Sequence, residues 1–395
     1  MSLRDEAAKL QGELATLRRE LHQIPEIGLN LPKTQRRVLA ALDGLPLEIS
    51  VGQNVSSVTA VLRGGRSGPL VLLRGDMDAL PVAEESKEEY ISRHDGVMHA
   101  CGHDLHTAGL VGAAKLLCAR RESLAGDVLF MFQPGEEGWD GAGHMIAEGV
   151  MEKAGRPVDA AYGLHVTSSE FEKGVFAARP GPLMAASDGL FVKVLGEGGH
   201  GSKPYGARDP IPAACEMVTA LQTMIGRRFD VFEPVVLTVG VINAGTRRNI
   251  IPDDAGFEAT VRTFSPDVSD RVREYATQLC QSIAAAYGLG VEVRYDKEYP
   301  ATVNDKAEYE FVAHTVGEVF GDARFAPMED PLMGSEDFSR VLERVPGAYV
   351  FLGACVGDDP SAAPANHSPR AAFDDAVLAD GAALLGELAV RRMDR

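Results

Sequence analysis

The sequence predicts an α/β fold: a mainly parallel sheet with helices on both faces, into which a smaller ferredoxin-like α+β domain is inserted. Two observations predict the larger α/β domain. Apolar, strand-like runs alternate with a helical pattern, and a small polar cluster follows several of these runs. A third observation predicts the insertion. From about residue 187 the elements follow the order β-α-β-β-α-β, which is the split βαβ pattern.

The elements of the larger domain follow in chain order. Residues 5–22 carry apolar side chains at helical spacing and stop before Pro25, so they predict an amphipathic helix. Residues 105–122 are rich in alanine, glycine and leucine, and their small side chains would let a helix lie close to the sheet. Buried strands are expected at residues 55–62, 69–73, 127–132 and 159–164.

A second domain is expected at residues 187–299. Its predicted strands and helices lie at residues 189–195, 210–228, 235–242, 256–264, 267–287 and 291–295, in which the second and fifth segments are helices. After Pro300 the α/β pattern returns. Residues 1–186 and 300–395 are therefore predicted to form one metal-binding catalytic domain that the second domain interrupts.

Composition excludes several classes of partner. The chain has 395 residues and 45% hydrophobic content, enough for a sizeable core. Acidic residues exceed basic ones by 57 − 39 = 18, and no basic block is interleaved with aromatics, so neither nucleic acid nor an anionic membrane is an expected partner. No signal-peptide core or long apolar span is present, and five scattered cysteines suit a reducing compartment. We expect a cytoplasmic protein.

Metal-binding side chains recur where strands end. Cys101 and His103 flank one glycine, and four of the ten histidines lie between positions 94 and 106. Further polar clusters of the same kind contain Asp76, Asp78, Glu136, Glu137, His165 and His367. Thiolate, imidazole and carboxylate groups at the carboxyl ends of parallel strands are what a catalytic metal site needs.

Each cluster alone has an ordinary alternative interpretation. Asp76 and Asp78 could be turn residues after a strand, and Glu136 and Glu137 could lie in a solvated loop. His165 could be a core histidine, and His367 could be a loop histidine. Alternation along an extended segment nevertheless points Asp76 and Asp78 to the same side. The occurrence of all the clusters in one position relative to strands favours a common site.

A glycine-rich loop invites a different interpretation. Gly196, Gly198 and Gly201 satisfy the G-x-G-x-x-G pattern of dinucleotide-binding folds. However, Pro204 lies where the phosphate-binding helix should begin, and the preceding strand does not open a parallel βαβ unit. A nicotinamide cofactor is therefore not expected.

Eight motifs between about residues 20 and 390 together resemble a known family. They are Arg-Gly-Asp-Met-Asp-Ala-Leu-Pro, Met-His-Ala-Cys-Gly-His-Asp, Gln-Pro-Gly-Glu-Glu-Gly, Gly-Leu-His, Gly-Gly-His-Gly-Ser-Lys-Pro, Asn-Ile-Ile-Pro, Gly-Ser-Glu-Asp-Phe and Asn-His-Ser-Pro. This set is similar to the aminoacylase/carboxypeptidase superfamily of dinuclear metal amidohydrolases. The Cys-Gly-His-Asp form resembles its branch of hippurate hydrolases, auxin-amino-acid conjugate hydrolases and N-acyl-L-amino acid amidohydrolases.

The resemblance implies a role for each candidate residue. It implies two divalent ions, of which zinc suits the donors best and manganese, nickel or cobalt are alternatives, held by Cys101, His103, Glu137, His165 and His367. It further implies Glu136 as general base and Asp78 as the residue that orients a ligand. His200 would help to polarise the scissile carbonyl, in several relatives from the partner subunit of a dimer, and Asn249 and Arg262 would bind substrate.

Three positions depart from or qualify the family pattern. Asp76 stands where relatives outside this branch carry a histidine ligand. Leu31 stands where the branch usually has glutamate, and the loop after His165 lacks the usual proline. The last two departures bear on substrate contacts rather than on the chemistry.

The function that these observations predict is hydrolysis of the amide bond of an N-acyl amino acid. The inserted domain would then serve as a lid and dimerisation domain, because His200 lies in a glycine-rich loop without a neighbouring ligand. Arg262 could bind the substrate carboxylate or form an ordinary surface ion pair. A dipeptidase or other exopeptidase is one alternative, and a non-catalytic metal-binding protein is another.

Overall fold

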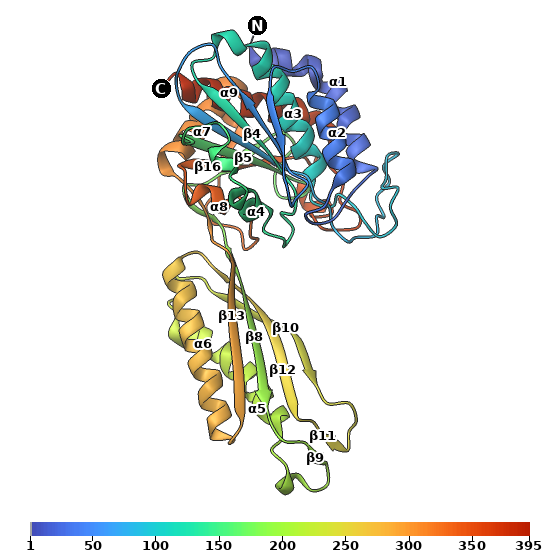
Figure 1. Cartoon of the computed structure of the whole chain (residues 1–395), viewed down its shortest axis with the longest axis vertical. Coiled ribbons are helices and arrows are strands. Elements are labelled where there is room, and N and C mark those ends of the chain that lie inside the picture. Colours follow the sequence, from blue (N-terminus) through green and yellow to red (C-terminus); the bar gives the residue numbers. More distant parts are fainter. Residues whose placement is uncertain (1) are drawn as a thin grey trace. The chain divides into compact units, whose positions relative to one another are not determined.

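The computed structural model describes residues 2–395 and divides the chain into two compact units (Figure 1). The large unit comprises Met1–Leu183, Val303–Asp330 and Asp337–Arg395. The inserted unit comprises Met184–Thr302 and Pro331–Glu336. The short second segment belongs to the inserted unit because Ala185 N donates to the carbonyl oxygens of Leu332 and Gly334.

An eight-stranded sheet forms the centre of the large unit. Its order is β1-β2-β4-β3-β5-β16-β6-β15. The strands are β1 (Glu48–Val51), β2 (Val58–Leu62), β3 (Leu70–Asp76), β4 (Asp127–Gln133), β5 (Ala160–Thr167), β6 (Phe176–Ala178), β15 (Phe325–Pro327) and β16 (Gly347–Gly353). The central pairs β4-β3, β3-β5 and β5-β16 are parallel, whereas β2 runs antiparallel to both of its neighbours. The mainly parallel sheet is confirmed.

Two predicted strands run further than expected. The strand predicted at residues 69–73 continues to Asp76, and the one predicted at 159–164 continues to Thr167. Asp76 and His165 therefore lie on the strands themselves rather than in the loops that follow them. Their backbones are held by ladder hydrogen bonds, which fixes the direction of each side chain.

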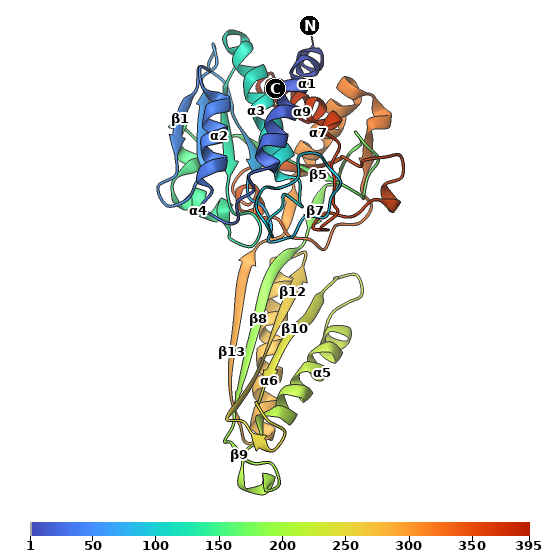
Figure 2. The ribbon, with the colours of Figure 1, turned by 90° about the vertical axis from the view of Figure 1, so that its right-hand side faces the viewer.

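Helices cover both faces of this sheet. One face packs its alternate residues, such as Val71 and Leu73 of β3, against the larger group of helices (Figure 2). That group is α1 (Leu3–His22), α2 (Pro32–Leu42), α3 (His103–Ala119), α7 (Lys306–Phe320) and α9 (Leu378–Met393). On the other face the ring of Tyr349 packs against Phe338, which precedes α8 (Ser339–Leu342), and α8 contacts α4 (Gly141–Ala147).

The inserted unit is an antiparallel four-stranded sheet with two helices on one face. The sheet order is β10-β12-β8-β13, the order of a ferredoxin-like fold. Its elements are β8 (Ala186–Leu195), α5 (Pro210–Arg228), β10 (Val236–Ala244), β12 (Asp254–Thr263), α6 (Pro266–Ala286) and β13 (Gly290–Tyr299). Smaller pairs join β9 (Gly199–His200) to β11 (Ile250–Ile251) and β7 (Gly181–Met184) to β14 (Thr302–Asn304). The helices pack against Leu190, Val192 and Val194 of the central strand β8.

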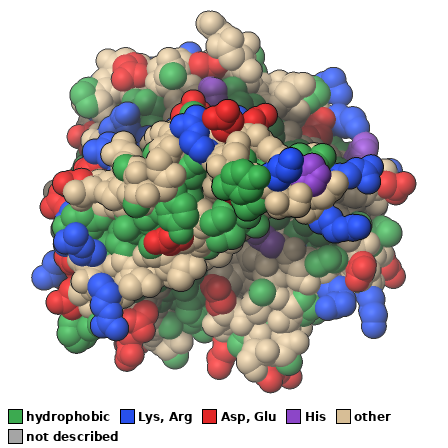
Figure 3. Space-filling view, turned by 90° about the horizontal axis from the view of Figure 1, so that it is seen from below, with side chains coloured by type: hydrophobic (Ala, Val, Ile, Leu, Met, Phe, Trp, Pro, Cys, Tyr) green, Lys and Arg blue, Asp and Glu red, His purple; other side chains and the backbone are tan. Residues whose placement is uncertain are grey.

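The surface agrees with the acidic composition. On the face that Figure 3 shows, acidic and basic side chains are interspersed, and no broad area is wholly basic. Among the described residues, none of the helices has the length and apolar character needed to cross a bilayer.

Candidate metal centre and active site

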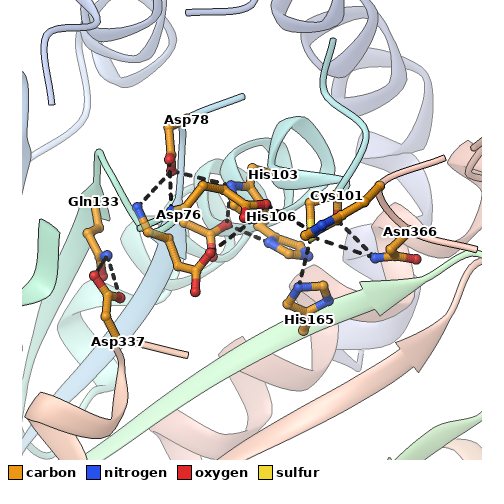
Figure 4. Close-up of polar contacts among 12 residues, drawn as sticks. Asp76, Asp78, Cys101, His103, His106, Gln133, His165, Asp337 and Asn366 are labelled. Atoms are coloured by element: carbon orange, nitrogen blue, oxygen red, sulfur yellow. Dashed lines mark hydrogen bonds and ion pairs between the residues drawn. The ribbon is translucent and has the colours of Figure 1, made fainter. Parts of the chain in front are cut away.

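The carboxyl ends of the central strands bring the candidate side chains together (Figure 4). Asp76 ends β3 and pairs in register with Gln133, which ends β4. His165 lies near the end of the neighbouring strand β5, and His103 is the first residue of α3. The site therefore lies where open parallel sheets place their ligands, because the ends of parallel strands meet at one edge.

Five predicted ligands converge on this edge. The Sγ atom of Cys101 lies 3.5 Å from Nε2 of His165 and 3.2 Å from Nε2 of His367. The Oε1 atom of Glu137 lies 3.3 Å from Nε2 of His367 and 3.9 Å from Nε2 of His103. These side chains form overlapping triads whose ligand atoms lie within 4.8 Å of one another. Residues that are up to 266 positions apart in the sequence thus surround a common space.

The donor set fits divalent cations. Both ring nitrogens of His103 and Oε1 of Glu137 are buried, and none has a hydrogen-bond partner among the residues that the structure describes. Burial lowers the pKa of His103, but Asp76, Asp78 and Cys101 outweigh it and raise this pKa well above its ordinary value. Burial raises the pKa of Glu137, but His367 and His103 outweigh it and lower this pKa. Buried polar atoms without hydrogen bonds are costly, and a bound cation would satisfy them.

Asp78 holds two parts of this cluster in place. Its Oδ1 and Oδ2 atoms accept hydrogen bonds from the backbone N–H groups of Glu136 and Glu137, at 3.0 and 3.1 Å. Oδ1 also lies 3.4 Å from Nδ1 of His103, so that Nε2 of this ring faces the glutamates. A carboxylate behind a histidine fixes the orientation of the ring and raises its basicity as a ligand.

His165 is held in the tautomer that a ligand requires. Its Nδ1 donates to the carbonyl oxygen of Val166 at 2.7 Å, so the lone pair lies on Nε2, which faces Cys101. Burial and the nearby ring of His106 depress the pKa of His165 well below its ordinary value. A neutral imidazole with its lone pair turned toward the cluster follows from these contacts.

Asp76 and His106 are occupied by protein partners. The backbone N–H of Val166 donates to Nε2 of His106 at 2.8 Å, and Nδ1 of this ring bonds Oδ1 of Asp76 at 2.5 Å. The other oxygen of Asp76 accepts from Arg74. Burial raises the pKa of Asp76, but Arg74 and the two histidines outweigh it and hold this pKa well below its ordinary value. These residues therefore brace the ligand strands.

The sequence singled out Asp76 but not its partner Arg74, nor Gln133 and Asp337, which also bind Arg74. This fully buried guanidinium bonds Gln133 and Asp337 as well as Asp76, and Asp337 also accepts from the backbone N–H of Ala142. The network thereby connects β3 and β4 to the end of the loop that carries Glu136 and Glu137, which is called the glutamate loop below. A charged residue directly after the apolar run Val-Leu-Leu was the available signal, because an arginine in a buried parallel strand needs several acceptors.

Backbone geometry supports the ligand loops. Gly102 has φ of +85°, and a Cβ at this position would lie 2.4 Å from Cγ2 of Val166, so only glycine separates the cysteine from the histidine without strain. His367 has φ of +71°, a conformation rarely adopted by non-glycine residues, and its N–H donates to the carbonyl of Ala100. Asn366, also missed from sequence, bonds the carbonyls of Cys101 and Val166.

In the inserted unit, His200 and Asn249 lie together. His200 ends β9 and pairs with Ile250 of β11, and the N–H of Gly201 donates to the carbonyl of Asn249 at 2.9 Å. A Cβ at Gly201 would lie 3.1 Å from the backbone of Asn249, a tight contact that glycine avoids. The glycines of the G-x-G-x-x-G pattern therefore allow backbone segments to approach one another. As expected, no phosphate-binding helix follows, and α5 begins only at Pro210.

Arg262 lies at the other end of the same unit. It is paired in register with Ser187, and its guanidinium donates to Ser187 Oγ at 2.9 Å. It lies eight positions after Asp254 on the extended strand β12, which corresponds to about 26 Å at 3.3 Å per residue. Because β11 lies only a few residues before Asp254, the structure separates Arg262 from His200 and Asn249.

Comparisons with known proteins agree with this geometry. Residues 72–391 match the model of Peptidase family M20/M25/M40. Thermostable carboxypeptidase 2 of Saccharolobus solfataricus is 37% identical over 393 residues, 98% of both chains, and hippurate hydrolase of Campylobacter jejuni is 34% identical over 391 residues, 99% of both. The solved YXEP protein of Bacillus subtilis, described as a dinuclear metal-binding peptidase of family M20, shares 31% identity with a TM-score of 0.83, covering 98% of this chain and 99% of its own.

These similarities extend over nearly the whole chain and agree in both sequence and fold. They confirm the resemblance drawn from the eight motifs and the mixed α/β fold with its large, mostly parallel sheet. The chain belongs to Peptidase family M20/M25/M40 and is a hydrolase of that family.

Proposed function

We propose that this protein is a metal-dependent amidohydrolase that cleaves N-acyl amino acids into a carboxylate and a free amino acid. The observation that carries the proposal is the position of Glu136. It directly precedes the ligand Glu137 on a loop held by Asp78, is 7% exposed, and lies with Oε2 4.0 Å from Nε2 of His103. A carboxylate beside a ligand cluster can serve as a general base.

We infer two divalent ions held by the five ligands, with Glu137 between two overlapping triads. Thiolate and imidazole donors suit zinc best, and manganese, nickel or cobalt are alternatives. When bound, such ions lower the pKa of a water and polarise an amide carbonyl. The similarity to a solved dinuclear metal-binding peptidase supports this inference.

The chain's own residues would then move the protons. Glu136 takes a proton from the attacking water and returns it to the nitrogen of the departing amine, so that the amine leaves as a neutral group and Glu136 is a carboxylate again. Asp78 keeps the glutamate loop and His103 in place during both transfers. His200 donates a hydrogen bond to the oxygen of the scissile amide, where negative charge develops.

The carboxylate of the substrate would be bound by Arg262. Burial lowers the pKa of its guanidinium more than Glu298 and Asp188 raise it, so the surrounding carboxylates do not fully compensate its buried charge. A substrate carboxylate would complete this compensation, and the planar fork of donors suits a carboxylate. Asn249 would contribute a second polar contact to the bound substrate.

The separation of Arg262 from His200 and Asn249 favours a homodimer. An N-acyl amino acid is too small to contact both ends of the inserted unit, which are about 26 Å apart along β12. We therefore infer that one subunit supplies His200 and Asn249 to the substrate whose carboxylate Arg262 of its partner binds. The inserted domain, residues 187–299, would act as the lid and the dimerisation domain. Five unpaired cysteines support a cytoplasmic location.

A substrate panel with added metals tests the function. The metal-free protein is loaded with each divalent ion and assayed against N-acetyl and N-benzoyl amino acids, their primary amides and free dipeptides. Hydrolysis of the N-acyl amino acids is expected to be the fastest. Faster cleavage of free dipeptides would instead favour an exopeptidase, an alternative that the carboxypeptidase relative supports. Metal binding without any hydrolysis would favour a non-catalytic role.

A further inference from the structure

The ring of His200 makes two contacts that the proposed function does not use. The backbone N–H of Ser202 donates to Nδ1 of His200 at 3.1 Å, and the hydroxyl of Ser202 lies 2.8 Å from the same nitrogen. A backbone N–H can only donate, so Nδ1 must act as the acceptor. In the neutral ring the proton therefore lies on Nε2, and the Ser202 hydroxyl can donate a second bond to Nδ1.

The loop that carries these contacts is held on both sides. His200 pairs with Ile250, and its own carbonyl accepts from the N–H of Lys203 at 2.7 Å. The neighbouring Gly198 donates to the carboxylate of Asp253 at 2.8 Å. Because the backbone is fixed on both sides of His200, the position of Ser202 relative to the ring is set by the loop itself.

We propose that Ser202 is a positioning residue that holds the proton of neutral His200 on Nε2, so that this ring acts as a hydrogen-bond donor. This inference rests on the proposed function for the identity of the acceptor, which is the oxygen of the scissile amide. The role differs from that of Glu136, because no proton is transferred. A fixed donor aimed at developing negative charge contributes mainly in the transition state.

In this role Ser202 acts through His200 and does not contact the reacting atoms itself. The loss of its hydroxyl should therefore have a specific effect on the kinetics. Loss of the Ser202 hydroxyl removes one of the two bonds to Nδ1, so the ring turns more freely and Nδ1 is protonated more often. We expect Ser202→Ala to lower kcat about three- to tenfold, the range for loss of one hydrogen bond between neutral groups, with little change in KM. Ser202→Thr keeps a hydroxyl and should restore most of kcat.

A double-mutant cycle separates this role from a structural one. In a His200→Ala background, Ser202→Ala should cause no further loss, since Ser202 acts only through the ring. Tyr205→Phe is the matched control, because it removes a hydroxyl from the same loop at a side chain that is 87% exposed. Equal losses from Ser202→Ala with and without His200 would overturn the proposal.

Nitrogen NMR of ¹⁵N-histidine-labelled protein provides a readout that needs no turnover. The His200→Ala variant identifies the His200 signals among those of the ten histidines. We expect a protonated Nε2 and an unprotonated Nδ1 in the wild-type neutral ring, and a shift toward protonated Nδ1 in Ser202→Ala. A proton on Nδ1 in the wild type would overturn the inference. Absence of amide hydrolysis with the expected NMR result would instead contradict the proposed function alone.

Discussion

The two sets of candidate residues differ in how completely their surroundings fix them. In the large unit, Asp78, His103 and His165 are buried, and each ring or carboxylate is oriented by backbone groups or charged neighbours. In the inserted unit, His200 and Asn249 are exposed and are held mainly through their backbones. The metal-binding cluster is thus oriented by many contacts within the large unit, whereas the side chains of His200 and Asn249 remain open to solvent.

The largest expected effect is on the buried cluster. Removal of metal by a chelator should abolish activity and lower Tm, because buried ligands would again lack partners. Cys101→Ala should bind less metal, since a methyl group cannot replace a thiolate ligand. Metal content by mass spectrometry, measured beside turnover, checks both. Cys215→Ala is the control, because that exposed cysteine lies outside the cluster. Full activity in the metal-free protein would exclude the two-metal interpretation.

Substitutions of Glu136 and Glu137 should have different effects on turnover and on metal binding. Glu136→Gln keeps the shape of the side chain but removes the base, so we expect roughly a 10²-fold or greater loss of kcat with the metal content unchanged. Glu137→Gln should mainly weaken metal binding, because Glu137 lies within ligand distance of His103 and His367. Metal titration and steady-state kinetics on both variants decide the assignment. Reversed phenotypes would exchange the two roles.

Mixing inactive subunits tests whether the inserted residues act on a partner. His200→Ala and Glu136→Gln proteins are unfolded or dissociated together and reassembled in equal amounts. If His200 acts across a dimer, mixed dimers contain one intact site, and about a quarter of the wild-type activity should return. Each variant carried alone through the same procedure is the control. No recovery, with mixed dimers shown by mass spectrometry, would place His200 in the same subunit's site.

A smaller effect is expected at Arg262, on specificity. Arg262→Ala should lower kcat/KM strongly for an N-acyl amino acid and much less for its primary amide, since only the acid offers a carboxylate to the guanidinium. Arg227→Ala, in the last turn of α5, is a matched control that removes an arginine elsewhere in the unit. Equal losses on acid and amide would remove the carboxylate role and leave a general amidase as the better description.

The smallest expected effect is a pH dependence of stability in the large unit. Burial opposes the charge of His22, but Asp104, at 2.7 Å, and Glu84 outweigh it and raise the pKa of this ring above its ordinary value of 6.5. The folded state therefore binds this proton more tightly than the unfolded chain. The resulting stability is fully present below pH 6.5 and is lost as the pH rises through the folded-state pKa. His22→Gln should lack this component in denaturant titrations, whereas His314→Gln, exposed on α7, should retain it.

Much of this molecule could be predicted from the sequence because its signals are local. The four predicted strands of the large sheet and the order of the inserted domain follow from apolar periodicity. The cysteine and histidine around Gly102 lie together because one left-handed glycine separates them. The ends of the strands could not be predicted in the same way. The last residues of β3 and β5 are part of these strands because they pair with neighbouring strands that are distant in the sequence.

The residue types and the apolar pattern of the chain show which chemical groups are present and that several of them follow buried strands. How these groups are used depends on contacts between segments that are distant in the sequence. Asp76 was among the polar candidates at the strand ends, but Arg74 and His106 bind its two carboxylate oxygens. Arg262 and Asn249 looked like one substrate site, but an extended strand holds them apart. Hydrogen-bond partners and distances across a fold depend on pairings between distant segments, and no local pattern in the chain records them.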